Sequence, residues 1–101
     1  MSVVVIARFR VSDMNQVMET LEANAAMLAE VTEQAKGMGC LHHRFVAGDG
    51  ELVVIDEWET PEQFQAFFEG NANVAKVAGE SGAQGPPSVS VFPSIEAAGT
   101  F

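Results

Sequence analysis

Cysteine and positive charge are scarce in this sequence. The single cysteine, Cys40, excludes an internal disulfide and favours a reducing, cytoplasmic setting. Five lysine and arginine residues stand against 14 aspartate and glutamate residues, which gives a formal net charge of -9. Nucleic acids and anionic lipid surfaces are both bound largely through cations. We therefore expect neither a nucleic acid nor a membrane as a partner.

Long apolar runs are also missing. No stretch approaches the roughly 20 apolar residues of a membrane-spanning helix. Residues 1–11 lack a charged segment followed by a long apolar one, so we expect no secretory signal. A length of 101 residues suits one domain, which we place at residues 1–95, with a tail at 96–101. So small a domain is only marginally stable alone and gains from self-association.

The first third of the chain predicts a strand and a long helix. Residues 3–11 (VVVIARFRV) are rich in β-branched side chains, which is typical of a strand. Ser12 is a suitable N-cap, and Asp13 follows in the first turn. Apolar residues then recur at steps of three and four until Lys36 and Gly37, a pair typical of a helix end. One long helix is expected between these limits.

The middle of the chain predicts a hairpin and a capped helix. Residues 39–47 and 51–59 read as strands, and the glycine-rich turn at 48–50 tolerates positive φ angles. Residues 60–63 (TPEQ) predict a capping box with Thr60 as N-cap and proline at the first helical position. The helix after it presents an aromatic stripe made of Phe64, Phe67 and Phe68.

The last third predicts a helical piece, a loop and a strand. Gly70 and Asn71 interrupt the second helix, and residues 72–78 form a further helical segment. Residues 79–87 are small, polar and rich in glycine, which indicates a mobile loop. Residues 88–95 predict the final strand, at an edge or bulge because Pro93 removes a ladder donor.

The predicted order of elements defines the fold class. Strand, helix, strand, strand, helix, strand is the α+β ferredoxin-like plan (βαββαβ), a four-stranded antiparallel sheet with helices on one face. Right-handed crossovers place the first and third strands at the centre. Both faces of these strands carry apolar residues, with Val4, Ile6, Val53 and Ile55 on the face away from the helices. We expect a second copy of the chain to cover that face, as a homodimer.

Two segments of the sequence resemble a known family. Residues 39–41 (GCL) with the hairpin after them, and residues 56–64 (DEWETPEQF), are similar to the antibiotic biosynthesis monooxygenase family of dimeric α/β-barrel proteins. The resemblance runs from Val3 to about Phe92 and is most specific at the Glu-Trp-Glu step into the second helix. It implies a dimer whose two sheets face each other and a pocket in each subunit between sheet and helices. Members of this family include cofactor-free oxygenases of quinol-like or polycyclic aromatic substrates and haem-degrading enzymes.

The haem-degrading branch matches this chain at one of three positions. Trp58 is shared with that branch. Its strand-one asparagine corresponds to Ala7 here, and its iron-binding histidine corresponds most nearly to Lys76. A protonated lysine has no lone pair for iron, so haem degradation is disfavoured.

Two histidines and a tryptophan are the candidate catalytic residues. Trp58 is either a core residue or a wall on which an aromatic ligand stacks. His42 and His43 point to opposite faces of their strand, so they cannot share a metal, and no other histidine exists. Each is either a structural residue or a general base or hydrogen-bond donor for substrate. The sequence does not say which one faces the pocket, and we expect neither a metal nor a cofactor.

Other side chains are candidates for substrate binding or for structure. Phe9 and the aromatic stripe are expected to line the pocket. Three arginines lie on strands, and they either form ion pairs with Asp56, Glu57 or Glu59 or, for Arg44, hold an anionic ligand. Those arginines are Arg8, Arg10 and Arg44. Asp56 and Glu57 face opposite ways and are no catalytic pair, and Cys40 is expected to be an unactivated, small apolar residue.

Two functions fit these expectations. The first is a cofactor-independent monooxygenase acting on a small quinol-like or polycyclic aromatic substrate, with Trp58 as stacking wall and one histidine as base. The second is a non-enzymatic dimeric protein that binds a small apolar ligand in the same pocket, which the shortage of clustered polar residues favours.

Overall fold

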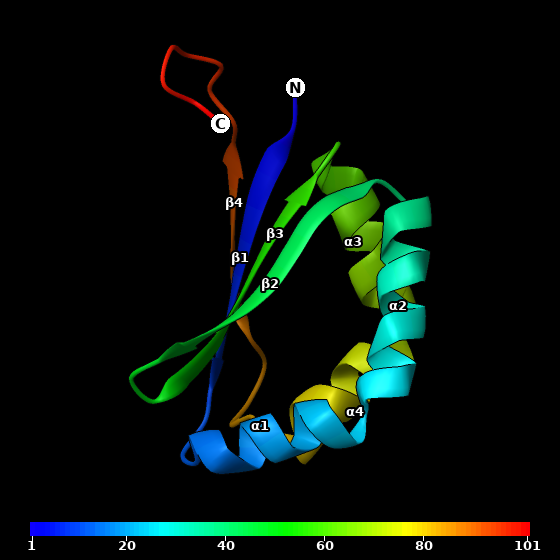
Figure 1. Cartoon of the computed structure of the whole chain (residues 1–101), viewed down its shortest axis with the longest axis vertical. Helices are drawn as coiled ribbons and strands as arrows, with labels where there is room; N and C mark the ends of the chain where they lie inside the picture. Colours follow the sequence, from blue (N-terminus) through cyan, green and yellow to red (C-terminus); the bar gives the residue numbers. More distant parts are fainter.

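The computed structural model describes residues 1–101 and contains one antiparallel sheet in the strand order β2-β3-β1-β4. The first and third strands are central, as the sequence predicted. Figure 1 shows the sheet edge-on, with all four helices on one side of it. This arrangement confirms the ferredoxin-like α+β fold. The four strands are β1 (Val3–Arg10), β2 (Cys40–Gly48), β3 (Glu51–Trp58) and β4 (Ser88–Pro93).

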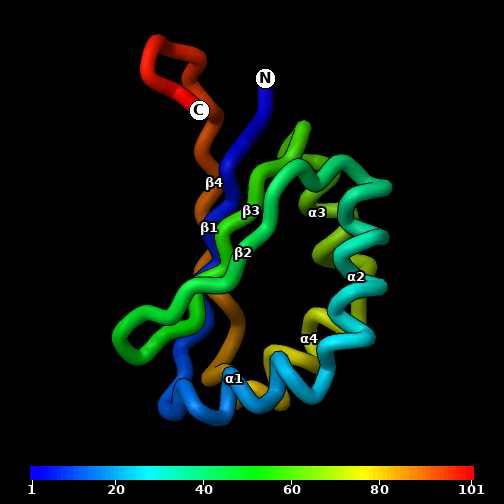
Figure 2. Tube along the Cα trace, in the orientation of Figure 1, coloured from blue at the N-terminus to red at the C-terminus, as the bar shows by residue number.

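The long helix predicted after the first strand is wrong, because the chain forms two helices there. They are α1 (Met14–Ala23) and α2 (Ala25–Gly37), and the trace bends sharply between them (Figure 2). Asn24 lies at the bend, where its Nδ2 donates to the Thr20 carbonyl oxygen at 2.9 Å and to Glu80 Oε1 at 3.0 Å. These bonds pair the Asn24 side-chain amide and the Thr20 carbonyl oxygen at the junction of the two helices. Because one of them goes to Glu80, the bend is stabilised by a residue distant in sequence.

Both ends of this helical segment also differ from the prediction. Asp13, not Ser12, is the N-cap, and its carboxylate accepts from the backbone N–H groups of Asn15 and Gln16 at 3.0 and 3.4 Å. Gly37 is still helical, and the left-handed residue is Gly39, with φ at 109°. A Cβ at Gly39 would lie 2.6 Å from the Gln63 side chain, so glycine is required by conformation and by space.

The second helical segment confirms the local prediction. Helix α3 (Pro61–Gly70) begins with a capping box, in which Thr60 Oγ1 accepts from the Gln63 N–H and Gln63 Oε1 accepts from the Thr60 N–H. Asn71 then caps α4 (Ala72–Glu80), which ends two residues later than expected. The loop that follows begins correspondingly later, and strand β4 stops at Pro93.

Side chains on the helical face of the sheet form two apolar clusters. The first contains Val5, Trp58 and Phe64 with Val3 and Ala35, and the second contains Phe9, Leu52 and Val17 with Ala7 and Val11. Only 15 of the 101 residues are buried. So small a core reflects two features: the clusters lie at the two ends of a hollow, and the opposite face of the sheet is uncovered.

The outer face of the sheet carries apolar residues with no helix over them. Val4, Ile6, Val53 and Ile55 lie there, each half-buried, and Phe92 is 52% exposed. An exposed sheet face normally alternates with polar residues more strictly than this one does. Separately, none of the helices is long and apolar enough to cross a membrane.

Candidate functional site

A cavity of about 510 Å³ lies between the sheet and the four helices. Hydrophobic residues make up 20 of the 26 that line it. The bend at Asn24 lets α1 and α2 curve around the hollow instead of packing flat on the sheet (Figure 1). Small side chains such as Ala7, Ala35 and Ala78 line it from the sheet and the helices, and they leave room that larger residues would fill.

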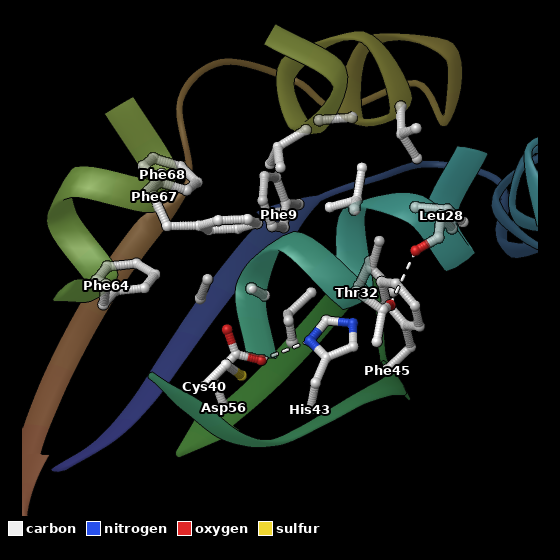
Figure 3. A pocket seen from close by; sticks show the side chains of 18 of the residues that line it. Phe9, Leu28, Thr32, Cys40, His43, Phe45, Asp56, Phe64, Phe67 and Phe68 are labelled. Atoms are coloured by element: carbon white, nitrogen blue, oxygen red, sulfur yellow. Dashed lines mark hydrogen bonds and ion pairs between the residues drawn. The ribbon is translucent and has the colours of Figure 1, made fainter. Parts of the chain in front are cut away.

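One hydrogen-bonded group of three side chains enters this apolar space. His43 Nδ1 lies 2.5 Å from Asp56 Oδ1, and Trp58 Nε1 donates to the other carboxylate oxygen, Oδ2, at 3.2 Å. Figure 3 shows the histidine and the carboxylate facing each other at the edge of the cavity. The Asp56 side chain is 11% exposed and the His43 side chain 34% exposed. The carboxylate is therefore largely shielded, while the imidazole is open to the hollow.

The strand geometry explains how these residues meet. Asp56 and Trp58 are two positions apart on β3, so their side chains share the helical face of the sheet. His43 is the register partner of Asp56 on β2. A bulge between Cys40 and His42 sets this register, because Cys40 lies opposite Trp58 and one extra residue separates it from His42. If the ladder ran without the bulge from the Cys40–Trp58 pair, His42 would lie opposite Asp56.

The hydrogen bonds fix the role of each His43 nitrogen. An ionised carboxylate only accepts hydrogen bonds, so Nδ1 is the protonated nitrogen and donates to Asp56. The other nitrogen, Nε2, has no hydrogen-bond partner in the chain, and it is the nitrogen that carries the lone pair in the neutral form of the ring. The ring also packs edge-on against Phe45, with 4.8 Å between the centroids. An imidazole held in this way can accept a proton or a hydrogen bond from a molecule in the cavity.

His42 also borders the cavity, but its side chain has a different environment. Its side chain is 80% exposed, and its Nε2 lies 3.8 Å from Glu57 Oε1 on the outer side of the sheet. The sequence left open which histidine faces the pocket, and the structure places the His43 side chain there.

The predicted aromatic residues all line the cavity. Trp58 is fully buried, and its ring contacts Phe64 and Phe67 with centroid distances of 5.9 and 5.3 Å. Phe68 stacks on Phe64 at 5.5 Å, and Phe9 faces them from β1 (Figure 3). Pairs of this kind are stabilised by ring electrostatics as well as by burial. They give one end of the cavity an aromatic wall.

The three strand arginines lie outside the cavity. Arg44 pairs in register with Ile55 on the outer face, and Arg8 and Arg10 lie on that same face of β1. None of the three forms a salt bridge within the chain. Their predicted ion pairs with Asp56, Glu57 or Glu59 therefore do not occur within one chain, because Asp56 and Glu57 lie near histidines. Arg44 does not reach the cavity that the aromatic residues line.

Cys40 borders the cavity as an unreactive thiol. Burial, and next the negative charge of Asp56, raise its pKa from 9.0 to about 11, although a hydrogen bond to the His42 carbonyl oxygen acts the other way. A thiol with so high a pKa has almost no thiolate at neutral pH. No group of three histidine, cysteine, aspartate or glutamate side chains is arranged to hold a metal ion.

Sequence reasoning missed two residues of this site. Asp56 was considered as a partner for arginine and rejected as one of a catalytic pair with Glu57, although the Asp-x-Trp spacing places it beside Trp58 on one face. Ser81 was not considered at all, because it falls in the glycine-rich segment. The structure places it on the cavity wall, 1% exposed, with no hydrogen-bond partner for its Oγ.

The fold and the cavity define a class of protein. The chain has the ferredoxin-like fold seen in solved antibiotic biosynthesis monooxygenase-type proteins, which confirms the resemblance noted in the sequence at the level of the fold. No protein-family model matches the sequence, and neither does any curated protein.

Three solved structures illustrate the likeness. A monooxygenase from the gene ActVA-Orf6 of Streptomyces coelicolor, in complex with nanaomycin D, is 18% identical, with a TM-score of 0.69 over 95% of this chain and 89% of its own. A putative antibiotic biosynthesis monooxygenase from Bordetella bronchiseptica is 20% identical, with a TM-score of 0.69 over 94% and 98%. The haem-degrading protein Rv3592 from Mycobacterium tuberculosis is 26% identical, with a TM-score of 0.59 over 98% and 100%.

Proposed function

We propose that this protein is a cofactor-independent monooxygenase acting on a small quinol-like or polycyclic aromatic substrate. The observation that carries the proposal is the 2.5 Å pair of His43 and Asp56 at the edge of an apolar cavity. Solved proteins of the same fold include monooxygenases, one of them in complex with nanaomycin D. That likeness supports the reaction class, and the pair supplies the chemical group that the reaction needs.

The cavity suits a flat aromatic ligand. Its volume of about 510 Å³ lies in the range of sites that enclose a small organic molecule. Within the aromatic wall Trp58 is fully buried behind its neighbours, and the half-buried rings of Phe67 and Phe68 offer faces and edges for ring stacking. With 20 hydrophobic residues among its 26, the lining excludes water and strengthens the few polar interactions inside.

In the proposed reaction His43 Nε2 takes the hydroxyl proton of a phenolic substrate, and Asp56 attracts the positive charge that forms on the imidazole. The electron-rich ring carbon of the phenolate passes one electron to dioxygen, and the resulting radical pair combines to form a carbon–oxygen bond. The imidazolium returns its proton to the outer oxygen, which gives a hydroperoxide. Loss of the ring C–H proton breaks the oxygen–oxygen bond and releases water. The net change converts a phenol and dioxygen to a quinone and water.

We further propose that the active form is a homodimer joined through the outer face of the sheet. Burying the apolar side chains of that face, which include Ile6, Val53 and Ile55, would stabilise the pair by the hydrophobic effect. Arg8, Arg10 and Arg44 lie on this face without a salt bridge in their own chain. A charge near an interface needs a partner, and the acidic side chains of a second copy can supply one.

A non-enzymatic, ligand-binding dimer is the alternative, and the scarcity of polar groups favours it. Only six of the 26 lining residues are polar, and two of these already have partners inside the chain: Asp56 accepts from two donors, and Thr32 Oγ1 donates to the Leu28 carbonyl oxygen at 2.8 Å. Thermal-shift measurements with a phenolic ligand, with and without oxygen, separate the alternatives. A binder is stabilised equally in both, whereas an enzyme consumes the ligand and oxygen only when oxygen is present.

Haem degradation fits the residues of this chain poorly, despite the 26% identity to a haem-degrading protein. Lys76, at the position compared with the iron-binding histidine, lies off the cavity wall, with its Nζ 3.3 Å from Glu80 Oε2. Ala7 offers no polar group from the first strand. Titration with haem is expected to give no sharp Soret band of a one-to-one complex, and such a band would contradict this assignment.

A further inference from the structure

We propose that Trp58 is a positioning residue of the candidate site, which acts on a bound molecule only through Asp56. This inference rests on the proposed function and deepens it, because it gives a different role to a residue that the sequence suggested as a stacking wall. Trp58 lies in the wall of the cavity, but it is 0% exposed. A ring with no accessible surface cannot present a face to a ligand, so any effect of the indole on the reaction must pass through a neighbour.

That neighbour is the carboxylate of Asp56. Trp58 Nε1 donates to Asp56 Oδ2 at 3.2 Å, and the bond is buried. An indole N–H can only donate and an ionised carboxylate can only accept, so the direction of this bond is fixed by chemistry. The Cys40 thiol also lies near Asp56, but it donates to the His42 carbonyl oxygen at 3.3 Å instead. The indole is therefore the one donor to Oδ2 in the chain.

The two oxygens of the carboxylate have separate partners. Oδ1 lies 2.5 Å from His43 Nδ1 on the neighbouring strand, and Oδ2 accepts from Trp58 on the same strand. With a donor at each oxygen, the carboxylate cannot turn about its Cβ–Cγ bond without losing a hydrogen bond. The indole thus fixes the plane of the Asp56 carboxylate, and the carboxylate fixes the imidazole that borders the cavity (Figure 3).

The indole is itself held in place by packing. Its ring contacts Phe64 and Phe67 with centroid distances of 5.9 and 5.3 Å. It also belongs to the buried cluster that contains Val3 and Val5, and it pairs in register with Val3 on β1. A group that orients a reacting side chain needs a locked conformation of its own, and a buried aromatic ring meets that requirement better than a flexible polar side chain does.

Because the chain has a single tryptophan, the indole N–H can be removed at one position only. Growth of a tryptophan auxotroph on 3-benzothienylalanine places sulfur where position 58 otherwise has Nε1. The analogue retains the size and shape of the ring but donates no hydrogen bond. Nitrogen-15 NMR at about pH 9, where an ordinary histidine is neutral, then reports which ring nitrogen of His43 carries the proton, and a His42→Ala sample assigns the signals.

In wild type, His43 is expected to show one form, protonated at Nδ1. In the analogue protein, the signal of the Nδ1 proton should weaken through faster exchange with water, and a form protonated at Nε2 should appear. The control is Phe64→Leu, which loosens the packing on the indole and keeps its N–H, so it should retain the single form. An unchanged His43 spectrum in the analogue protein, or the same change in Phe64→Leu, would overturn the positioning role.

Oxygen uptake separates this role from the proposed oxygenase activity. With 1,5-dihydroxynaphthalene as substrate, the analogue is expected to lower kcat about tenfold and to leave unchanged the Kd of the same compound, measured without oxygen. In Asp56→Ala the indole has no carboxylate to hold, so the analogue should cause no further loss. A tenfold loss that persists in Asp56→Ala would overturn the inference. Absence of uptake by wild type would overturn the oxygenase alone, since the NMR spectra test the positioning role independently.

Discussion

His43 and Asp56 face each other across neighbouring antiparallel strands, with 2.5 Å between Nδ1 and Oδ1. Trp58, two residues along β3 and on the same face, donates its indole N–H to the second carboxylate oxygen. The carboxylate thus orients the imidazole, and the indole orients the carboxylate. This chain of contacts gives an otherwise apolar cavity one group that is able to move a proton.

Replacing Asp56 by asparagine is expected to lower activity without changing the size or shape of the cavity. The amide preserves the size of the side chain but loses the charge that attracts the imidazolium and no longer enforces protonation at Nδ1. We expect kcat/KM for oxygen uptake to fall about 100-fold or more. The control is Glu57→Gln, one residue along the strand and on the opposite face. Equal rates in wild type and Asp56→Asn would contradict the orienting role.

The thiol of Cys40 is expected to resist alkylation in the folded protein. With a pKa of about 11, roughly one thousandth of the thiol is ionised at pH 8, compared with about a tenth for the ordinary value of 9.0. Labelling with iodoacetamide, followed by mass spectrometry, should be slow until the pH exceeds about 10. The urea-unfolded chain, with the same single cysteine, is the control and should react at the ordinary rate. Rapid labelling of folded protein at pH 8 would show that the thiol is activated.

The same shift affects stability at alkaline pH. A raised pKa means that the folded state favours the neutral thiol, so the unfolded state loses its proton first, near pH 9. The free energy of unfolding should therefore fall as pH rises from about 9 to about 11, and Cys40→Ala should show less of this decrease. Urea titrations at a series of pH values measure it.

Glu80 is expected to make a contribution to stability that disappears in acid. Its pKa is lowered below 4.5, first by the hydrogen bond from Asn24 and then by that from Lys76. A lowered pKa favours folding above the ordinary value, and the effect is lost as pH falls through the folded-state value. Urea unfolding should show Glu80→Gln less stable than wild type at pH 7, with a gap that narrows below pH 4.5. A gap independent of pH would exclude this ionic role.

Charging the outer face of the sheet is expected to dissociate the proposed homodimer. Ile55→Asp places a carboxylate at the centre of the face, where burial without a partner costs several kcal/mol. Sedimentation velocity should show a dimer for wild type at micromolar concentration and a monomer for the variant. Met18→Asp, on an exposed side chain of α1, is the control and should stay dimeric. A monomeric wild type would contradict pairing through this face.

Much of the fold could be predicted from local signals, because those signals act over a few residues. The capping box at Thr60 and Gln63, the alternation in β1 and the break at Asn71 depend on near neighbours, and each appears as predicted. The bend at Asn24 could not be predicted in this way. It depends on a hydrogen bond to Glu80, a residue 56 positions away.

Which polar side chains meet at the site depends on strand register more than on composition. The aromatic lining followed from helical spacing and strand alternation, so Phe9, Phe64, Phe67 and Phe68 were predicted correctly as lining residues of the cavity. The choice between the histidines depends on a bulge of one residue between Cys40 and His42, and nothing in the sequence marks it. The buried position of Ser81 beside the cavity depends on how the helices pack, so the sequence alone does not predict it.

Oxygen uptake by two histidine variants tests whether His43 is the base of an oxygenase. Wild type, His43→Ala and His42→Ala are compared in an oxygen electrode with a fused-ring phenol or quinol, after sedimentation has verified that all three have the same assembly state. We expect His43→Ala to lower the catalysed rate about 100-fold or more and His42→Ala, which removes a side chain 80% exposed beside Glu57, to leave it unchanged. Equal losses in both variants, or no uptake above buffer in wild type, would show that His43 is not the base of an oxygenase.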